Sequence, residues 1–216
     1  MNQLLQIVVG ELESGKSEWK TLYAEVVQVL WKHGFSGATV FRSDEGIGEK
    51  DDIRAFILED VQFNNLPIVI ETVERADRIH SVLPELRSII PHGEMAIMNA
   101  YSLMEEELPV KHNEALMLKI YIKEKSSWFS RALYEEILDM FQKRDLIWTT
   151  VTKGIEGFGR DHVIHKQSLF SFSSQVPIVI ESVGKAEVIQ EIIPELRERV
   201  KEGMVIAVSV QVVIDR

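Results

Sequence analysis

The chain has 216 residues, a formal net charge of −10 and no cysteine. At roughly 100–200 residues per domain, this length allows one large domain or two small ones. The missing cysteines exclude disulfide scaffolds, thiolate zinc sites and cysteine nucleophiles, and the acidic balance disfavours nucleic-acid binding, which depends on clustered Lys and Arg.

The first predicted element is an apolar strand, Leu4–Val9. The chain starts without a basic region and this apolar stretch stops at Gly10, so we expect no secretory signal peptide. No other apolar run approaches the ~20 residues that a membrane helix needs, so we also expect no membrane insertion. A chain without cysteine fits a reducing compartment, and the expected location is cytoplasmic.

A helix is predicted next, because Leu22, Val26 and Leu30 recur at the spacing of one helical face. Gly34 is a suitable stop for this helix. A β-rich segment, a glycine-containing loop and a return segment follow; the two segments are Ala38–Phe41 and Arg54–Glu59.

The next strand, Leu66–Glu71, is apolar on both faces, so we expect it at the centre of a sheet. A second helix is predicted from apolar residues at helical spacing, which are Ala76, Ile79, Val82, Leu83, Leu86 and Ile90. Pro84 falls inside this pattern, and a proline in a helix interior costs ~3 kcal/mol. We therefore expect a kink or a break between two short helical pieces, followed by a final strand, Glu94–Ala100.

The second half of the chain repeats the first. Leu66–Glu71 returns as Val176–Glu181, and Pro84–Arg87 returns as Pro194–Arg197, both 110 residues later. Upstream the offset is 111, and near the start it is 113, small shifts of the kind that loops of a diverged tandem duplication show. We predict two domains, residues 1–103 and 116–216, joined by a polar linker at 104–115.

Each repeat has the order βαββαβ, which predicts an α+β fold of two tandem ferredoxin-like domains, with both helices on one face of an antiparallel sheet. The strands expected in the second repeat are Met117–Ile122, Thr149–Thr152, His165–Phe170, Val176–Glu181 and Met204–Ile214. Leu4, Val8, Met117 and Tyr121 are apolar on the side of the first strands opposite to the helices. We expect this second face to be buried by sheet-to-sheet association between copies or between chains.

A glycine-rich loop in the second repeat is the candidate binding site. Gly154, Gly157 and Gly159 let backbone N–H groups approach an anion, and Lys153 and Arg160 supply charge. The same spacing also fits a mobile loop that binds nothing. The first repeat has the acidic stretch 43–49 in this place and carries the whole net charge, so anion binding is expected in the second repeat.

The segment Lys153–Arg160, after a Thr-Val strand, resembles the loop of the PII-like proteins of domain of unknown function 190. The Leu-Tyr helix start, the Leu-Pro-Ile-Val-Ile-Glu strand and the Leu-Pro-Glu-Leu helix are also similar to that family, which is related to the nitrogen-regulatory PII signalling proteins. The resemblance implies a homo-oligomer, typically trimeric, that binds ATP, ADP or AMP in a cleft between subunits. The ligand-binding residues it implies are Thr150, Lys153, Gly154, Gly157, Phe158, Gly159 and Arg160.

The resemblance further implies an effector-sensing role with a regulated protein partner and without catalysis. We expect no catalytic residue, since no serine lies in a nucleophile elbow. We expect no metal site, since His162 and His165 lack a third ligand at suitable spacing, and no cofactor beyond a nucleotide effector. The alternative is a structural or partner-docking oligomer that uses its acidic first domain and binds no ligand.

Overall fold

The computed structural model describes residues 1–16, 20–47, 53–55, 65–104, 108, 114–123, 132–144, 146–166 and 177–213. The chain forms two compact units. The first unit contains Gln3–Met98 and Ile155–Ile164, and the second unit contains Met1–Asn2, Asn99–Gly154 and His165–Arg216. The segment Ile155–Ile164 therefore belongs to the second repeat by sequence and to the first unit by packing.

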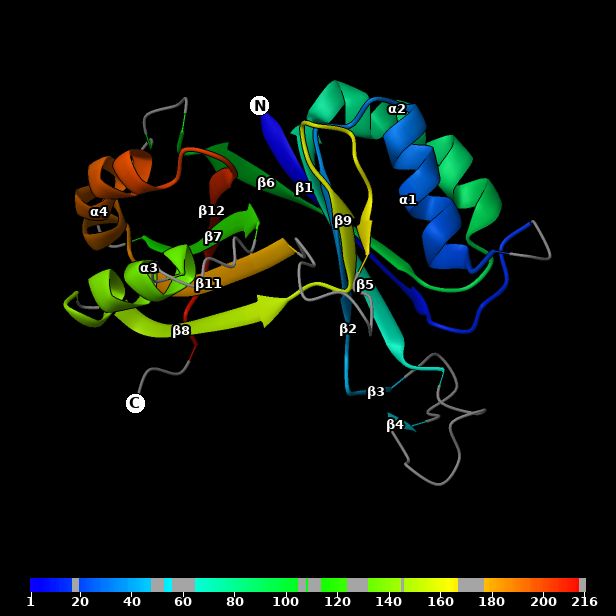
Figure 1. The fold of residues 1–216 in the computed structure, drawn as a ribbon, viewed down its shortest axis with the longest axis horizontal. Helices are drawn as coiled ribbons and strands as arrows, with labels where there is room; N and C mark the ends of the chain where they lie inside the picture. The colour runs from blue at the N-terminus through cyan, green and yellow to red at the C-terminus, as the bar shows by residue number, and fades with distance from the viewer. Residues whose placement is uncertain are drawn as a thin grey trace. The chain divides into compact units, whose positions relative to one another are not determined.

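The first unit is a mixed α/β structure in which two helices pack on a sheet (Figure 1). Its elements are β1 (Asn2–Gly10), α1 (Leu22–Lys32), β2 (Ala38–Arg42), β5 (Pro67–Arg75), α2 (Ala76–Ile89), β6 (Glu94–Ser102) and β9 (Glu156–Phe158). The strands lie in the order β9-β2-β5-β1-β6, so β5 is internal, as its apolar sequence predicted. A separate antiparallel pair is formed by β3 (Glu45–Ile47) and β4 (Ile53–Ala55).

The core of the first unit lies between the sheet and its helices. Leu5 and Ile7 of β1 pack with Val26 and Leu30 of α1, and all four are fully buried. The helix ends where predicted: Gly34 has φ 68°, in the left-handed region, and the Phe35 N–H donates to the Leu30 carbonyl. The helices α1 and α2 lie against each other and against β5 (Figure 1).

The second unit repeats this architecture (Figure 1). Its elements are β7 (Ala115–Lys123), α3 (Leu133–Gln142), β8 (Leu146–Lys153), β10 (His165–Lys166), β11 (Pro177–Lys185), α4 (Ala186–Arg199) and β12 (Met204–Val210). Antiparallel pairing gives the order β12-β7-β11-β8. The end of β6, Asn99–Ser102, belongs to the second unit, where Ser102 lies opposite Ile206 of β12. No helix in the described part of the chain is long and apolar enough to cross a membrane.

The expected break in the second helix is wrong, because α2 and α4 are each one uninterrupted helix of 14 residues with the proline inside. The residues four positions before the prolines, His80 and Gln190, are exposed, so water can solvate their carbonyl groups. Ile79 and Val82 before Pro84, and Leu86 after it, are fully buried. Burial of ~1.5–3 kcal/mol per side chain on both sides of the proline outweighs its cost.

Three other expectations fall partly outside the described residues. Only the first residues of the return segments at 54–59 and 165–170 are described, and most of the linker at 104–115 is not. Of that linker, Leu108 is buried in the core of the second unit. The last strand ends at Val210, earlier than predicted, and Ile214 lies outside the described residues.

Candidate functional site

The seven predicted ligand-binding residues fall into two groups. Thr150 and Lys153 lie in β8, and Gly154 follows it, all in the second unit. The other four belong to the first unit; these are Gly157, Phe158, Gly159 and Arg160, in or just after β9. Whether they bind a ligand stays a prediction, and each group has its own surroundings.

The β8 group lies on the outer strand of the second unit. Thr150 and Lys153 are both exposed, whereas Gly154 is buried and its N–H donates to the Pro177 carbonyl at 2.8 Å. Side chains alternate along a strand, so Thr150 and Lys153 point to opposite faces of the sheet. A ligand that contacts both therefore has to lie along the outer edge of β8.

Thr150 also belongs to a row of polar residues that crosses three strands of the second unit. In the strand register, Lys119 of β7 lies opposite Glu181 of β11, and Glu181 lies opposite Thr150. The Lys119 Nζ is 3.0 Å from the Glu181 Oε2, and the exposed fractions of the two side chains are 6% and 27%. A buried ammonium is tolerated when an anion pairs with it, so Glu181 stabilises the charge of Lys119.

The first unit has a row at the same place. Gln6, Glu71 and Thr39 are the repeat equivalents of Lys119, Glu181 and Thr150. The Gln6 Nε2 donates to the Glu71 Oε1 at 3.0 Å, and Thr39 lies opposite Glu71 in the strand register. Both rows lie on the second face, turned away from the helices, because at least one strand neighbour of each residue belongs to a core cluster or packs against it. The rows differ in charge, since the second has a cation where the first has an amide.

Burial of the second face is extensive. Leu4 and Ile206 are fully buried, and Glu71 and Lys119 are 3% and 5% exposed. Thr150 and Trp148, at the outer strand of the second unit, remain exposed. The apolar pattern predicted this burial, while the sheet-to-sheet association stays a prediction. The residues that sequence reasoning missed are Lys119 and Gln6, whose signal was a polar residue within an apolar strand at the same place in both repeats.

The β9 group pairs with β2. Phe158 lies opposite Ala38, Gly157 opposite Thr39 and Glu156 opposite Val40, in an antiparallel pair. The Ile155 N–H donates to the Val40 carbonyl at 2.8 Å. Phe158 is 5% exposed and belongs to the core of the first unit. The glycine-rich segment therefore completes the first unit's sheet in this structure.

The close approach of β9 to the start of β2 explains why residue 37 is a glycine. A Cβ at Gly37, just before β2, would lie 3.0 Å from the Phe158 carbonyl oxygen, tighter than ordinary van der Waals contact. On the opposite strand, Gly157 places no side chain beside Thr39 in the polar row. Thr39 is 6% exposed, so there is little free space at this end of the row.

The chain after β9 is held by α1. The Trp31 Nε1–H donates to the His162 carbonyl at 2.8 Å, and the two rings make an edge contact. The His162 ring also stacks on Phe158, with 6.3 Å between ring centroids. His162 has φ 52°, an uncommon value for a residue with a side chain. Among the described residues no group of three His, Asp or Glu side chains is placed to hold a metal ion.

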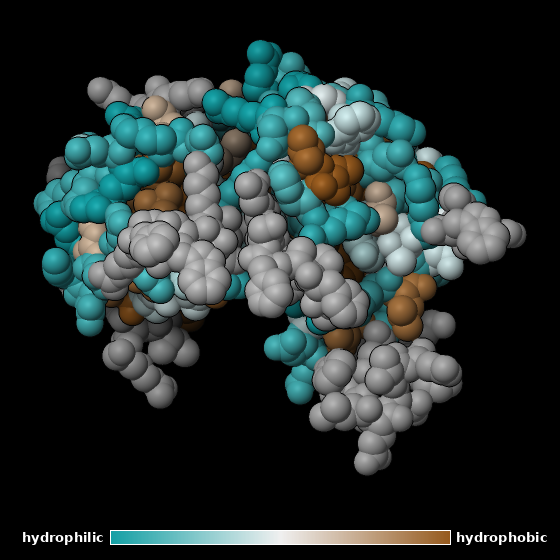
Figure 2. Space-filling model, viewed as in Figure 1, coloured by the Kyte–Doolittle hydropathy of each residue, from teal (hydrophilic) through white to brown (hydrophobic). Residues whose placement is uncertain are grey.

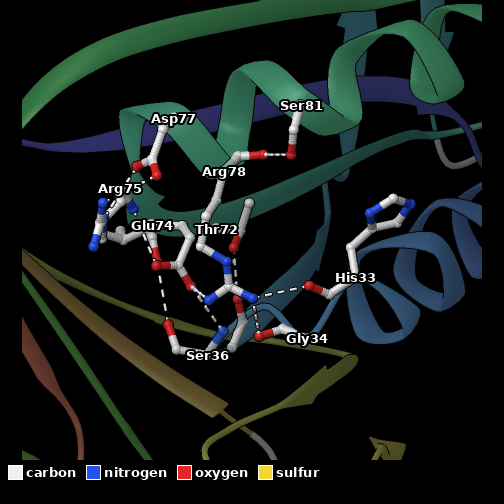
Figure 3. A network of polar contacts seen from close by, with 11 residues as sticks. His33, Gly34, Ser36, Thr72, Glu74, Arg75, Asp77, Arg78 and Ser81 are labelled. Atoms are coloured by element: carbon white, nitrogen blue, oxygen red, sulfur yellow. Dashed lines mark hydrogen bonds and ion pairs between the residues drawn. The ribbon is translucent and has the colours of Figure 1, made fainter.

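A network around Arg78 fixes the turn that leads into β2 (Figure 3). The Arg78 guanidinium donates to the carbonyls of His33 and Gly34, at 2.9 and 2.6 Å, and pairs with Glu74 at 3.0 Å. Glu74 also accepts from the Ser36 N–H at 3.2 Å. Because these bonds satisfy the end of α1, they set the position from which β2 starts and at which β9 pairs.

A charged hollow of about 460 Å³ lies between α3 and α4 in the second unit. Its lining residues are Glu136, Asp139, Met140, Lys143, Arg144, Glu195 and Arg199. Arg144 and Arg199 both pair with Glu195, at 3.4 and 2.9 Å. In the first repeat His33 and Glu85 occupy the places of Arg144 and Glu195 and lie 2.6 Å apart. The shared contact ties the end of one helix to the next, which is a structural role.

The described surface shows no large apolar patch in the view of Figure 2. In Figure 2 the described apolar residues form small patches separated by hydrophilic side chains. The exposed large apolar side chains include Val163 and Ile164, which are 51% and 38% exposed and follow β9.

The fold and the site define a class: two mixed α/β repeats with antiparallel sheets, each with a polar row across its second face. Residues 2–101 and 115–212 each match the family described as "Uncharacterized ACR, COG1993", domain of unknown function 190. The chain belongs to this family and contains two copies of its domain.

Two curated relatives each match a part of the chain. A "UPF0166 protein" of Aquifex aeolicus is 28% identical over 97 residues, which cover 45% of this chain and 91% of the relative. The "UPF0166 protein MJ1524" of Methanocaldococcus jannaschii is 30% identical over 96 residues, which cover 44% of this chain and 88% of the relative. Each of these relatives thus has about the length of one repeat.

Solved structures are more distant. An unknown protein from Galdieria sulphuraria is 9% identical, with a TM-score of 0.30, over 97% of this chain and 98% of its own. A putative chlorite dismutase is 10% identical, also with a TM-score of 0.30, over 98% of this chain and 96% of its own.

Proposed function

We propose that this protein is a PII-like regulatory protein that senses a small anionic effector, with an adenine nucleotide as the leading candidate. In this proposal each repeat is a ferredoxin-like domain, the chains form a homo-oligomer, with a trimer favoured, and the protein acts in the cytoplasm on a protein partner without catalysis. Membership of the family and the same strand order in both repeats support the fold part of the proposal.

The observation that carries the effector site is the exposed outer strand of the second unit. The Thr150 hydroxyl and the Lys153 ammonium group are exposed on β8, and an anion along this edge has a donor and a cation within one strand. Thr150 continues the row that contains Lys119, the cation that the first repeat lacks. On the equivalent strand β2, Thr39 is 6% exposed and β9 occupies the edge.

Calorimetric titration with ATP, ADP and AMP tests this proposal. Lys153→Ala should weaken nucleotide binding at least tenfold, because a hydrogen bond to a charged group contributes about 1.5–3 kcal/mol. Arg42→Ala is the matched control, since Arg42 occupies the same place in the first repeat, and its affinity should equal that of the wild type. If no nucleotide binds the wild type at millimolar concentration, the sensing role is wrong.

One observation favours the alternative, a structural or partner-docking oligomer. The loop expected to bind the ligand is packed as β9, with Phe158 buried in the first unit. In this alternative the acidic first repeat binds a protein and no nucleotide is involved. A pull-down from native lysate, with and without added nucleotide, separates the two, since only the sensing role predicts that nucleotide changes partner capture.

A further inference from the structure

The outer strands of the two repeats are equivalent but are paired differently. The offset of 111 residues relates Ala38, Thr39 and Val40 of β2 to Thr149, Thr150 and Val151 of β8. The outer edge of β2 is paired with β9. In the second unit, the sheet order within the described residues ends at β8, whose neighbour is β11. An edge strand of this kind is a template for another strand.

The strand that pairs with β2 also has an equivalent. β9 has the sequence Glu156-Gly157-Phe158, and at the same offset the first repeat has Glu45-Gly46-Ile47, which forms β3. Both segments are three-residue strands with the pattern Glu-Gly-apolar. β9 adds to a large sheet, whereas β3 pairs with β4 in a two-stranded sheet. The chain thus has two equivalent donor segments, β9 and β3, and two equivalent acceptor edges, those of β2 and β8. Of these, β9 and β2 pair with each other within the chain.

We propose that β3 of a second copy of this chain pairs with β8, as β9 pairs with β2 within the chain. The register transfers directly: Ile47 lies opposite Thr149, Gly46 opposite Thr150 and Glu45 opposite Val151, in antiparallel orientation. Main-chain hydrogen bonds supply the affinity and the alternate side chains supply the specificity, as in other cases of strand addition. The occupant is a second copy because β9 and β2, the equivalents of β3 and β8, already pair within the chain.

The transferred register places β3 of the partner copy on the edge of β8 that contains the candidate effector site, as β9 lies on the edge of β2. Gly46 has no side chain to cover the Thr150 hydroxyl, and Lys153 lies beyond the paired residues. A ligand along the edge at Thr149–Val151 and the partner's β3 are therefore alternative occupants of this backbone. One difference remains at the far end: Trp148 replaces Gly37, so the carbonyl of Ile47 lies a few tenths of an ångström further out than that of Phe158.

This interface specifies how the proposed homo-oligomer assembles and rests on that part of the proposed function. Each copy offers one donor and one acceptor, so two copies that exchange strands close a dimer, and a one-way exchange closes a ring when the rotation allows. Both assemblies contain the same contact. The nucleotide titration and the trapping experiment report different occupants of this edge, so each can fail without the other.

Disulfide trapping tests the contact, because the chain has no native cysteine. Residues directly opposite in an antiparallel pair have Cα atoms about 4.5–5.5 Å apart, within the range for a disulfide. Chains with Glu45→Cys and chains with Val151→Cys are mixed and oxidised mildly. We expect a disulfide-linked dimer that contains one chain of each kind. Val40→Cys with Glu156→Cys in one chain is the positive control, and it should close within the chain.

Each outcome of the trapping experiment decides the proposal. A mixed dimer from Glu45→Cys and Val151→Cys, with none from Glu45→Cys and Thr152→Cys, supports the register, because Thr152 points to the other face. Absence of the mixed dimer while the positive control closes overturns the strand exchange. So does closure within a single chain that carries both Glu45→Cys and Val151→Cys. If trapping fails, light scattering of the wild type shows whether the chain still forms an oligomer. An oligomer without this contact overturns the strand exchange alone, whereas a monomer also overturns the proposed homo-oligomer.

Discussion

Single polar residues within apolar strands distinguish the two repeats. Lys119 and Gln6 occupy the same place, and each bonds to the equivalent carboxylate of its repeat, Glu181 or Glu71. A carboxylate in a largely buried row needs a donor, and either an ammonium or an amide can supply one. The pairing at this place is therefore a requirement of both repeats, while the positive charge is a property of the second.

Substitution of Lys119 should show which of these properties stability depends on. Lys119→Gln keeps a donor, as in the first repeat, and we expect its free energy of unfolding to change by less than about 1 kcal/mol. Lys119→Met removes the donor, and we expect a loss of about 1–3 kcal/mol. Urea unfolding measures both, with Gln6→Met as the matched variant in the first repeat. Equal losses for the Gln and Met variants would contradict the interpretation.

At the level of elements, the two helices of each repeat are joined by a contact that follows the proline. Glu195 follows Pro194 directly and lies between Arg144 at the end of α3 and Arg199 one turn later on α4. The hydrogen bond from Arg199 lowers the pKa of Glu195 below its ordinary value of 4.5, against the opposing effect of desolvation. The charge of Glu195 therefore stabilises the folded chain.

This shift predicts how stability depends on pH. Because the pKa of Glu195 is lower in the folded state than in the unfolded state, its contribution is fully present above about pH 4.5 and is lost as the pH falls through the folded-state pKa. Glu195→Gln should thus be less stable than the wild type at pH 7, and the two should converge below that pKa. Thermal unfolding across this range measures the difference, and Glu191→Gln, an exposed change on the same helix, is the control. A difference that stays constant with pH would exclude the charge as its cause.

Local pattern predicted the elements well and their partners only in part. The spacing of Leu22, Val26 and Leu30 predicted α1, and the duplication at 110–113 residues predicted the second set of elements. The pairing of β9 with β2 joins segments more than 100 residues apart, and three residues with a central glycine carry no alternating pattern. The glycine that the close strand pair requires is Gly37, before β2, which was not among those that suggested an anion loop.

At the scale of the whole chain, the first compact unit contains residues of both repeats. Residues 155–164 lie in the sequence of the second repeat and complete the sheet of the first unit. Phe158 contributes a buried aromatic side chain to a core that is otherwise built from the first repeat. A first repeat without this segment exposes the edge of β2 and leaves a cavity in its core.

The first repeat alone should therefore bind the missing segment when it is supplied separately. We expect residues 1–103 to be less stable than the same unit in the full chain and to be stabilised by a peptide of residues 153–165. A peptide with Phe158→Ala should bind at least a hundredfold more weakly, because removal of a buried phenyl ring costs about 3–5 kcal/mol. A peptide with Val163→Ala is the control, since Val163 is 51% exposed in the same segment. Fluorescence anisotropy of labelled peptides measures the affinities. Equal binding of all three peptides, or none of the wild-type peptide to a folded fragment, would mean that β9 is not needed to complete the first unit.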